Sequence, residues 1–278
     1  MSKQTKFPKY NILGVEVDAL TIRQAINYIF ENLQSKKRNN IYITKPYVEF
    51  IVKASRDKKI AKILKKSELC LADGVSLQKA ASFIYGKKKV NLIRSLFWIS
   101  SDQQWLSQVL PERMAGTNFT IPLFELCQKN NYRIGIIGGK EPQKLMIRLK
   151  KIFPKLNLAQ TWNGFFDEDQ ESEIVKNIAS NNLDILFVAM GFPRQEFFIY
   201  NNLKKLNTKI AIGEGGTFDY RQLGGNLARA PQPLQKVGLE WLWRLFLQPK
   251  RFLRQITIFK FFLLVYKQAK NYSKTPLR

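Results

Sequence analysis

Short runs of continuous hydrophobic residues alternate along this chain with longer segments in which hydrophobic residues recur at helical spacing. The clearest runs cover residues 132–139, 183–191 and 209–216, and each of them ends in glycine. Helical segments, EPQKLMIRLKKIFP and PRQEFFIYNNLKKL, follow the first two runs. We therefore predict an α/β fold, with a mostly parallel sheet and helices on both of its faces.

The same alternation is found nearer the N-terminus. Residues 41–54 begin as a β-rich run, and residues 50–69 then carry hydrophobic residues at the spacing of a helix. The SELCL run at residues 67–71 predicts a short strand that ends just before Asp73.

Two segments interrupt this rhythm. Residues 83–112 are rich in aromatic residues and lysine, and they predict a loop or a helical insertion. Residues 241–278 contain many basic residues and no acidic ones, interleaved with Trp, Phe, Leu and Ile. We therefore divide the chain into a main domain, residues 1–240, and a basic C-terminal helical appendage, residues 241–278.

The appendage predicts an amphipathic helix. Its basic residues interrupt every hydrophobic run before it approaches the roughly twenty residues that cross a bilayer. Hydrophobic residues recur near helical spacing at Phe252, Leu253, Ile256, Phe259, Leu263 and Tyr266. We expect this helix to lie on an anionic membrane surface. The alternative is a helix packed on the protein's own core.

Composition narrows the chemistry that is available. The 278 residues include 46 Lys and Arg against 21 Asp and Glu, a net charge of +25, which indicates an anionic partner. The absence of histidine excludes Ser-His-Asp triads and His-ligated metal sites. Only Cys70 and Cys127 are present, so we expect neither a disulfide framework nor a cysteine metal site. These features, and an N-terminus without a secretory signal pattern, indicate a cytoplasmic protein.

The glycines that end the three predicted strands are candidate phosphate or ribose contacts, because carboxyl ends of parallel strands form the usual ligand edge of an α/β sheet. They are Gly138, Gly139, Gly191, Gly215 and Gly216. Tight turns without a ligand explain them equally well. No GxGxxG or P-loop motif is present.

Asp73 is a candidate general base. It follows a predicted short strand, where the scaffold can hold a carboxylate within reach of a substrate hydroxyl. An Asx-turn or a helix N-cap is the alternative interpretation of this residue.

Six sequence blocks, in this order, resemble the WecG/TagA/CpsF family of glycosyltransferases. The blocks are ADG at 72–74, RMAG at 113–116, GFPRQE at 191–196, GEGGTFDYRQLGG at 213–225, RAP at 229–231 and GLEWLWRLFLQPKRFLRQ at 238–255. The resemblance runs from about residue 41 to residue 254, and it implies a Rossmann-like core.

The resemblance also implies a function. Members of this family transfer an N-acetylmannosamine-type sugar from a UDP-sugar to a polyprenyl-diphosphate-linked sugar, in the synthesis of cell-surface polysaccharide or teichoic-acid-like polymers. It therefore implies an inverting hexosyltransferase that needs no cofactor and no essential metal. Such an enzyme would be peripheral at the inner face of the plasma membrane, and a homo-oligomer stays open.

Residue by residue, the resemblance makes Asp73 the catalytic base and Arg113 an active-site cation near the diphosphate. Gln195 and Glu196 would lie in the donor pocket. The appendage would supply arginines to the active site, here Arg244, Arg251 and Arg254. A solvated basic helix face is the alternative for these three arginines.

The chain departs from the family's pattern in a few places. Thr44 begins a TKPYVE segment in which Tyr47 takes the place of the family's Asn. We therefore expect the sugar contacts of Thr44 and Tyr47 to differ from those of other family members. Residues 83–112 contain an insertion, and Asn118 stands where Asp is common. A basic α/β protein that binds nucleic acid is the alternative function, because aromatic residues lie among the basic ones, but it leaves the ordered blocks unexplained.

Overall fold

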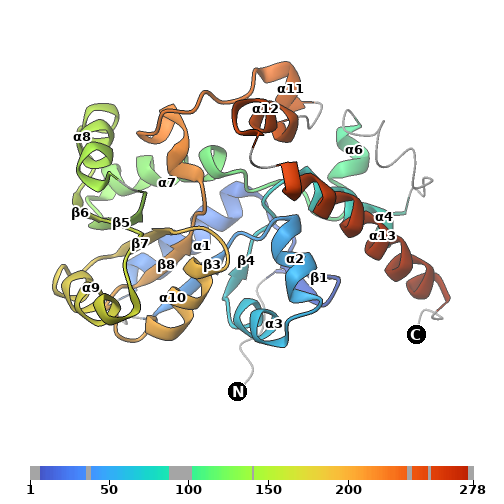
Figure 1. Cartoon of the computed structure of the whole chain (residues 1–278), viewed down its shortest axis with the longest axis horizontal. Coiled ribbons are helices and arrows are strands. Elements are labelled where there is room, and N and C mark those ends of the chain that lie inside the picture. Colours follow the sequence, from blue (N-terminus) through green and yellow to red (C-terminus); the bar gives the residue numbers. More distant parts are fainter. Residues whose placement is uncertain are drawn as a thin grey trace.

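The computed structural model describes residues 7–35, 39–87, 102–139, 141–236, 240–249 and 252–274. Its centre is a six-stranded, fully parallel sheet in the order β4-β3-β8-β7-β5-β6 (Figure 1). The strands are β3 (Ile41–Thr44), β4 (Leu69–Cys70), β5 (Ile134–Gly138), β6 (Leu158–Trp162), β7 (Ile185–Ala189) and β8 (Ile210–Gly213). The α/β prediction is confirmed.

Helices cover both faces of this sheet, as alternation along its strands requires. In β8, Ile210 and Ile212 pack into one hydrophobic cluster, whereas Ala211 packs into another on the opposite face. The first face is covered by α1 (Ile22–Gln34), α7 (Gly116–Asn130) and α8 (Pro142–Ile152). The second is covered by α3 (Lys58–Lys65), α9 (Glu168–Ser180) and α10 (Arg194–Asn202).

The helical pattern of residues 50–69 forms two helices. α2 (Val48–Ala54) ends at Ser55, and Asp57 then caps α3 by accepting hydrogen bonds from the backbone N–H groups of Lys59 and Ile60. An N-cap carboxylate satisfies N–H groups that have no partner within the helix, and so it favours a new start at this point. The helical spacing predicted over residues 50–69 is therefore divided between two helices.

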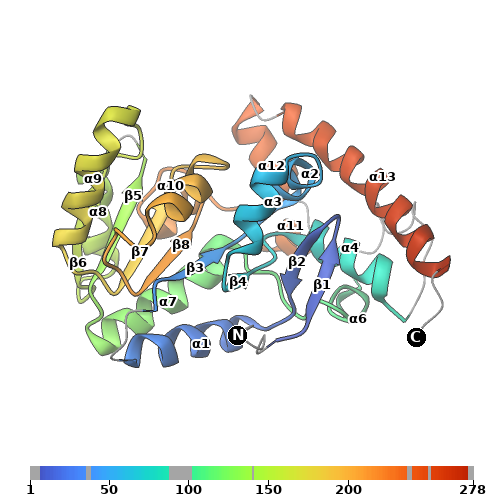
Figure 2. The ribbon, with the colours of Figure 1, turned by 90° about the horizontal axis from the view of Figure 1, so that it is seen from below.

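A third hydrophobic cluster lies beside the sheet, and it joins both ends of the chain. It contains the antiparallel hairpin of β1 (Lys9–Ile12) and β2 (Val15–Asp18), together with α2 and α4 (Val75–Tyr85). Phe261, Phe262 and Val265 of α13 (Phe252–Lys274) complete this cluster. Figure 2 shows α13 running along this side of the molecule.

The C-terminal helix thus packs on the protein's own core along one face. Its Gln268 amide also closes the hairpin turn, because Nε2 donates to the Asn11 carbonyl and Oε1 accepts from the Leu13 N–H. The opposite face leaves Ile256, Phe259 and Leu263 exposed. The helix therefore combines a docked face with a free hydrophobic stripe.

The remaining elements are short helices that lie outside the sheet. They are α6 (Gln103–Leu106), η2 (Thr217–Asp219), η3 (Arg221–Leu223), α11 (Gln232–Lys236) and α12 (Glu240–Leu247). Residues 88–101 of the segment 83–112, where an insertion is expected, lie outside the described residues. Within the described part of the chain, no helix combines the length and hydropathy needed to cross a bilayer.

The packing of α13 gives a matched pair of substitutions. Phe261 is fully buried, whereas Phe259, two residues earlier in the same helix, is 64% exposed. We expect Phe261→Ala to lower the free energy of unfolding by about 3–5 kcal/mol through lost burial and a cavity. Phe259→Ala should change it by about 0.5 kcal/mol or less. Urea unfolding measures both values, and equal losses would contradict the observed orientation of the helix.

Candidate functional site

A cavity of about 650 Å³ opens at the carboxyl-terminal edge of the sheet. It is bounded by segments that follow β3, β4, β5, β7 and β8, and by α12 of the appendage. Nine of the residues named from the sequence line it: Tyr47, Asp73, Arg113, Gly139, Gly191, Gln195, Gly215, Gly216 and Arg244. Ligands bind at this edge in open α/β sheets.

Three glycines give this cavity an accessible backbone. Gly139, Gly191 and Gly215 have φ values of 73°, 77° and 56°, a region that favours glycine. Among the described residues, apart from the glycine itself and its two chain neighbours, no atom lies within 4 Å of the position that a Cβ would take at any of the three. Their peptide groups can therefore approach a bound phosphate or ribose closely.

Gly138 has a different role. A Cβ at this position would lie 2.5 Å from the Ala189 carbonyl oxygen, so the absence of a side chain allows β5 and β7 to pair closely. Gly138 is not among the residues that line the cavity.

Asp73 is held beside the cavity by backbone contacts. Its N–H donates to the Pro46 carbonyl at 2.9 Å, and Gly74, with a φ of 105°, follows it as the N-cap of α4. The Met114 N–H donates to the Ala72 carbonyl at 2.8 Å. These bonds bring Asp73 and the neighbouring Arg113 to one cavity from separate parts of the sequence.

The surroundings of Asp73 favour its neutral form more than water does. Burial raises the pKa of this carboxyl from 3.8 to about 6, with Glu214 and Glu240 adding to the rise and Lys45 and Arg244 opposing it. A carboxyl with such a pKa can accept a proton near neutral pH. This arrangement suits a general base.

A buried ion pair lies in the same cavity. Lys45 Nζ is 2.6 Å from Glu214 Oε2, and the two residues are 3% and 4% exposed. The ammonium group also lies 5.0 Å from the centre of the Phe119 ring. Both residues directly follow strands, Lys45 after β3 and Glu214 after β8.

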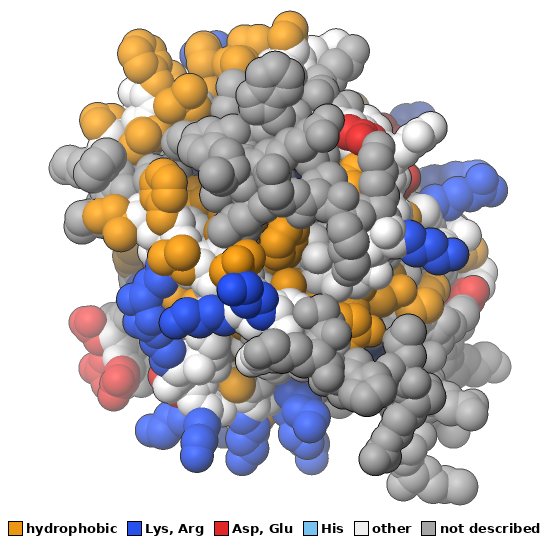
Figure 3. Space-filling view, turned by 90° about the vertical axis from the view of Figure 1, so that its right-hand side faces the viewer, with side chains coloured by type: hydrophobic (Ala, Val, Ile, Leu, Met, Phe, Trp, Pro, Cys, Tyr) orange, Lys and Arg blue, Asp and Glu red, His pale blue; other side chains and the backbone are white. Residues whose placement is uncertain are grey.

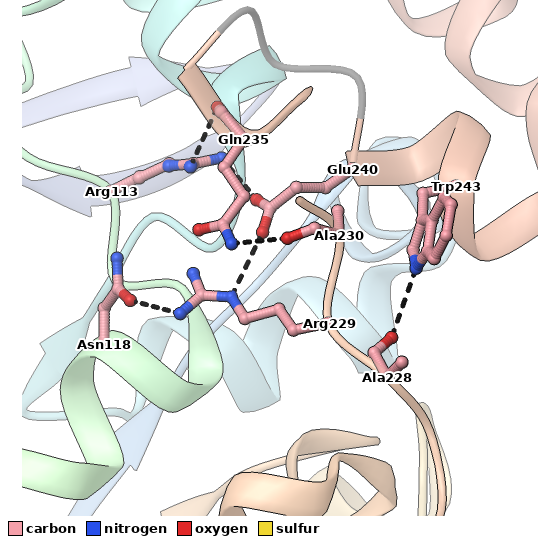
Figure 4. A network of polar contacts seen from close by, with 8 residues as sticks. All are labelled: Arg113, Asn118, Ala228, Arg229, Ala230, Gln235, Glu240 and Trp243. Carbon is pink, nitrogen blue, oxygen red and sulfur yellow. Dashed lines mark hydrogen bonds and ion pairs between the residues drawn. The ribbon is translucent and has the colours of Figure 1, made fainter. Parts of the chain in front are cut away.

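Glu240 of α12 binds two arginines at the cavity wall. Its Oε2 accepts a hydrogen bond from Arg113 Nη1 at 2.6 Å, and its Oε1 lies 3.4 Å from Arg229 Nε (Figure 4). Arg229 Nη1 donates to Asn118 Oδ1 at 2.7 Å. Figure 4 shows the carboxylate between the two guanidinium groups. Charge-assisted hydrogen bonds thus tie the start of α12 to Arg113 and Arg229.

Arg244 is the second contribution of α12 to this wall. Its Nη2 donates to Asp219 Oδ2 at 2.9 Å, and its guanidinium lies 5.1 Å from the centre of the Tyr220 ring. Arg251 lies outside the described residues, as does the side chain of Arg254. Their expected place in the active site stays a prediction.

Gln195 lines the cavity, and Glu196 lies buried behind it. Gln195 Oε1 accepts from the Gly215 N–H at 2.9 Å, while its Nε2 donates to Glu196 Oε1 at 2.9 Å. Thr44 is also buried, with its hydroxyl 3.5 Å from Glu196 Oε1. Neither Thr44 nor Glu196 lines the cavity. These two residues support Gln195 and the Gly215 turn from behind.

The comparison with family models agrees with the sequence blocks. The model described as glycosyl transferase WecG/TagA/CpsF family matches residues 10–99 and 94–275. This chain belongs to the WecG/TagA/CpsF family. Its two matched segments share residues 94–99, which fall within the segment 83–112 where the sequence predicts an insertion.

A relative from Bacillus subtilis (strain 168) is 34% identical over 164 residues. Its name is N-acetylglucosaminyldiphosphoundecaprenol N-acetyl-beta-D-mannosaminyltransferase. The alignment covers 58% of this chain and 62% of the relative, so it spans less than two thirds of that protein's length. Neither comparison supports the nucleic-acid-binding alternative.

Among the cavity residues that the sequence did not identify as site residues are Lys45, Glu214, Arg229 and Glu240. Lys45 and Glu214 each follow a strand end, and that position was the available signal for both. Arg229 lies in the RAP block and Glu240 in the EWLWRL block, but nothing local indicates that they meet. Their contact depends on how α12 docks.

The buried carboxyl of Glu196 should make the stability of the protein depend on pH. Burial raises its pKa from 4.5 to about 8, so the folded protein keeps a proton that the unfolded chain releases. The wild type therefore loses stability as the pH rises from about 4.5 to about 8. We expect the stability of Glu196→Gln, relative to wild type, to increase over this interval in urea unfolding. Glu173→Gln, an exposed change on α9, is the control. If its stability relative to wild type rose with pH in the same way as that of Glu196→Gln, the raised pKa of Glu196 would not be the cause of the rise.

Proposed function

We propose that this chain is an inverting, UDP-sugar-dependent hexosyltransferase. It transfers an N-acetylmannosamine-type sugar to a polyprenyl-diphosphate-linked sugar in the synthesis of cell-surface polysaccharide or teichoic-acid-like polymers. Family membership and the name of the Bacillus subtilis relative support this proposal. The observation that carries it is a partly buried carboxyl of raised pKa, Asp73, in one cavity with Arg113, Arg229 and Arg244.

Asp73 acts as the general base. Inversion requires one in-line displacement, in which the acceptor hydroxyl attacks the anomeric carbon of the donor as its own proton is removed. The bond from the anomeric carbon to the donor diphosphate breaks in the same step. The proton passes to Asp73, and UDP leaves with the electron pair.

The arginines stabilise the leaving diphosphate. Guanidinium groups donate parallel hydrogen bonds to phosphate oxygens, and they perform electrostatically what a metal ion does in other transferases. Arg113, Arg229 and Arg244 are now bound to Glu240 and Asp219, so a bound diphosphate would share or replace these carboxylates. Gly139 and Gly191 leave the backbone uncovered at the cavity, where their N–H groups would add donors, whereas the Gly215 N–H is already bound to Gln195 Oε1.

Gln195 faces the donor. Its amide, fixed by Gly215 and Glu196, lines the cavity close in sequence to the glycine turn at Gly191 that would bind the nucleotide. Tyr47 lines the cavity at the position of the family's Asn, and its hydroxyl donates to Glu49 Oε2 at 3.1 Å. We assign Tyr47 to a sugar contact.

The appendage holds the enzyme at the inner face of the plasma membrane, as a peripheral protein. On α12 and α13, Phe246, Ile256, Phe259 and Leu263 are exposed, and basic residues flank them. Figure 3, which faces the side of the molecule where α13 lies, shows hydrophobic side chains next to basic ones. Such a surface suits insertion of hydrophobic residues among anionic headgroups.

The decisive experiment is an assay with the full-length protein. UDP-sugars are screened against a short-chain polyprenyl-diphosphate-linked N-acetylglucosamine acceptor, with excess EDTA in a parallel set. We expect one UDP-sugar to give a product of inverted configuration, in equal yield with and without EDTA. Absence of product with every donor would overturn the proposed function. Loss of product in EDTA, restored by Mg²⁺ or Mn²⁺, would assign leaving-group stabilisation to a metal.

Asp73→Asn tests the base in the same assay. The amide preserves the size of the side chain but cannot take the proton, so turnover should fall by roughly a hundredfold or more. The affinity for UDP, measured by calorimetry, should stay within a few-fold of wild type. Turnover above a third of the wild-type rate, with chemistry rate-limiting, would show that another group is the base.

A combined Ile256→Ser, Phe259→Ser and Leu263→Ser variant tests membrane binding without uncovering the core, because all three side chains are exposed. We expect it to sediment poorly with anionic vesicles and to transfer slowly to the lipid-linked acceptor. Its thermal unfolding should match wild type. Ile147→Ser, an exposed change on α8, is the control. Unchanged vesicle binding of the triple variant would remove this stripe from the membrane contact.

A further inference from the structure

The Lys45–Glu214 pair lies in the same cavity as Asp73. β3 and β8 are neighbours in the sheet, so Lys45 and Glu214, which directly follow them, reach the cavity side by side. Asp73 follows β4, which pairs with the other side of β3. The charges of Lys45 and Glu214 both act on Asp73. The pair is therefore close to the group proposed to act on the acceptor hydroxyl.

One oxygen of this pair has no partner. Glu214 Oε2 binds Lys45, whereas the buried Glu214 Oε1 makes no hydrogen bond to any described residue. A buried polar atom without a partner costs about 1–3 kcal/mol. A buried ion pair adds little to stability, because a protein with well-packed hydrophobic residues in its place is often equally stable or more stable. Stability alone therefore gives no reason for this arrangement.

The backbone holds Glu214 firmly in place. Its N–H donates to the Val188 carbonyl at 2.8 Å, and its carbonyl accepts from the Thr217 hydroxyl at 2.7 Å. The next residue, Gly215, is bound by Gln195 Oε1. With the backbone and one oxygen fixed, the free oxygen has a defined position, and a bound group could be recognised there without a loss of side-chain entropy.

The chemistry of the free oxygen selects the type of ligand group. An ionised carboxylate only accepts hydrogen bonds, so its partner must be a donor, such as a hydroxyl or an amide N–H. Phosphate oxygens are acceptors and would be repelled. The diphosphate is thereby left to the arginines of the cavity, and a sugar, which carries hydroxyl donors, suits the free oxygen of Glu214.

We propose that Glu214, oriented by Lys45, is a specificity-determining residue that accepts a hydrogen bond from a hydroxyl or amide N–H of one of the two sugars. This inference rests on the proposed transferase function. The donor sugar and the acceptor sugar carry the same chemistry, and separate measurements distinguish them.

The test replaces both members of the pair, so that no buried charge is left alone. Lys45→Met with Glu214→Met keeps the approximate size of both side chains and removes the accepting oxygen. Lys144→Met with Glu141→Met removes an exposed ion pair outside the cavity, and it is the matched control. Each variant is compared with wild type for thermal unfolding, UDP affinity, UDP-sugar affinity and the acceptor KM.

We expect the Lys45 and Glu214 double variant to bind free UDP within about twofold of wild type, because UDP carries no transferred sugar. Its affinity for the UDP-sugar, or its KM for the lipid-linked sugar, should weaken by about tenfold or more, as the loss of a hydrogen bond to a charged group implies. A weaker affinity for the UDP-sugar assigns Glu214 to the donor sugar, and a higher KM for the lipid-linked sugar assigns it to the acceptor. The control should match wild type in all four measurements.

Glu214→Asp provides a second variant that retains both charges and withdraws the oxygen by one methylene group. If the double variant does not fold, the same loss of sugar affinity with unchanged UDP affinity is expected of Glu214→Asp. Unchanged affinity for both sugars in a folded variant would overturn the inference, while wild-type transfer would still uphold the proposed function. Absence of transfer by wild type would overturn the proposed function, and with it this inference.

Discussion

The cavity depends above all on the parallel pairing of β3 with β8. This pairing joins segments that lie 169 residues apart at Lys45 and Glu214, and it aligns the carboxyl ends of both strands at one edge. The neighbouring pairs, β3 with β4 and β8 with β7, extend the same edge in both directions. Because the strands are parallel, every segment that leaves their carboxyl ends reaches the same region. The acid, the glycine turns and the cations share one cavity for this reason.

Electrostatics within this cavity are balanced rather than uniformly positive, although the chain carries a net charge of +25. Lys45, Arg113, Arg229 and Arg244 each contact a carboxylate in the described structure. Burial raises the pKa of Asp73 to about 6. The carboxylates nearby raise this pKa further, whereas the cations nearby lower it. The excess positive charge therefore belongs to the surface, where it suits long-range attraction to anionic membranes and lipid-linked substrates. Inside the cavity, geometry rather than net charge distinguishes one ligand group from another.

Local patterns in the sequence were sufficient for much of this architecture. Glycine at the end of a hydrophobic run predicts both a strand and its turn, so Gly139, Gly191 and Gly215 could be found before the fold was known. Asp73 could be found for a similar reason, because it follows a short strand. The ion pairs of Glu214 and Glu240 could not, since each depends on packing between distant segments. The docked face of α13 was equally hidden, because that helix is hydrophobic on more than one side and helical spacing alone does not say which side is covered.

The burial of α13 beside the β1–β2 hairpin has a consequence for how the chain matures on the ribosome. Ile12 and Val15, among the first described residues, share one hydrophobic cluster with Phe261 and Val265. The hairpin turn also lacks its hydrogen bonds from Gln268 until that residue has been made. Domains generally fold as units during synthesis, with N-terminal segments emerging first. Here the hairpin, α2 and α4 can assemble most of this cluster early, but the part of it that α13 covers stays exposed to water until residues 261–265 have been synthesised.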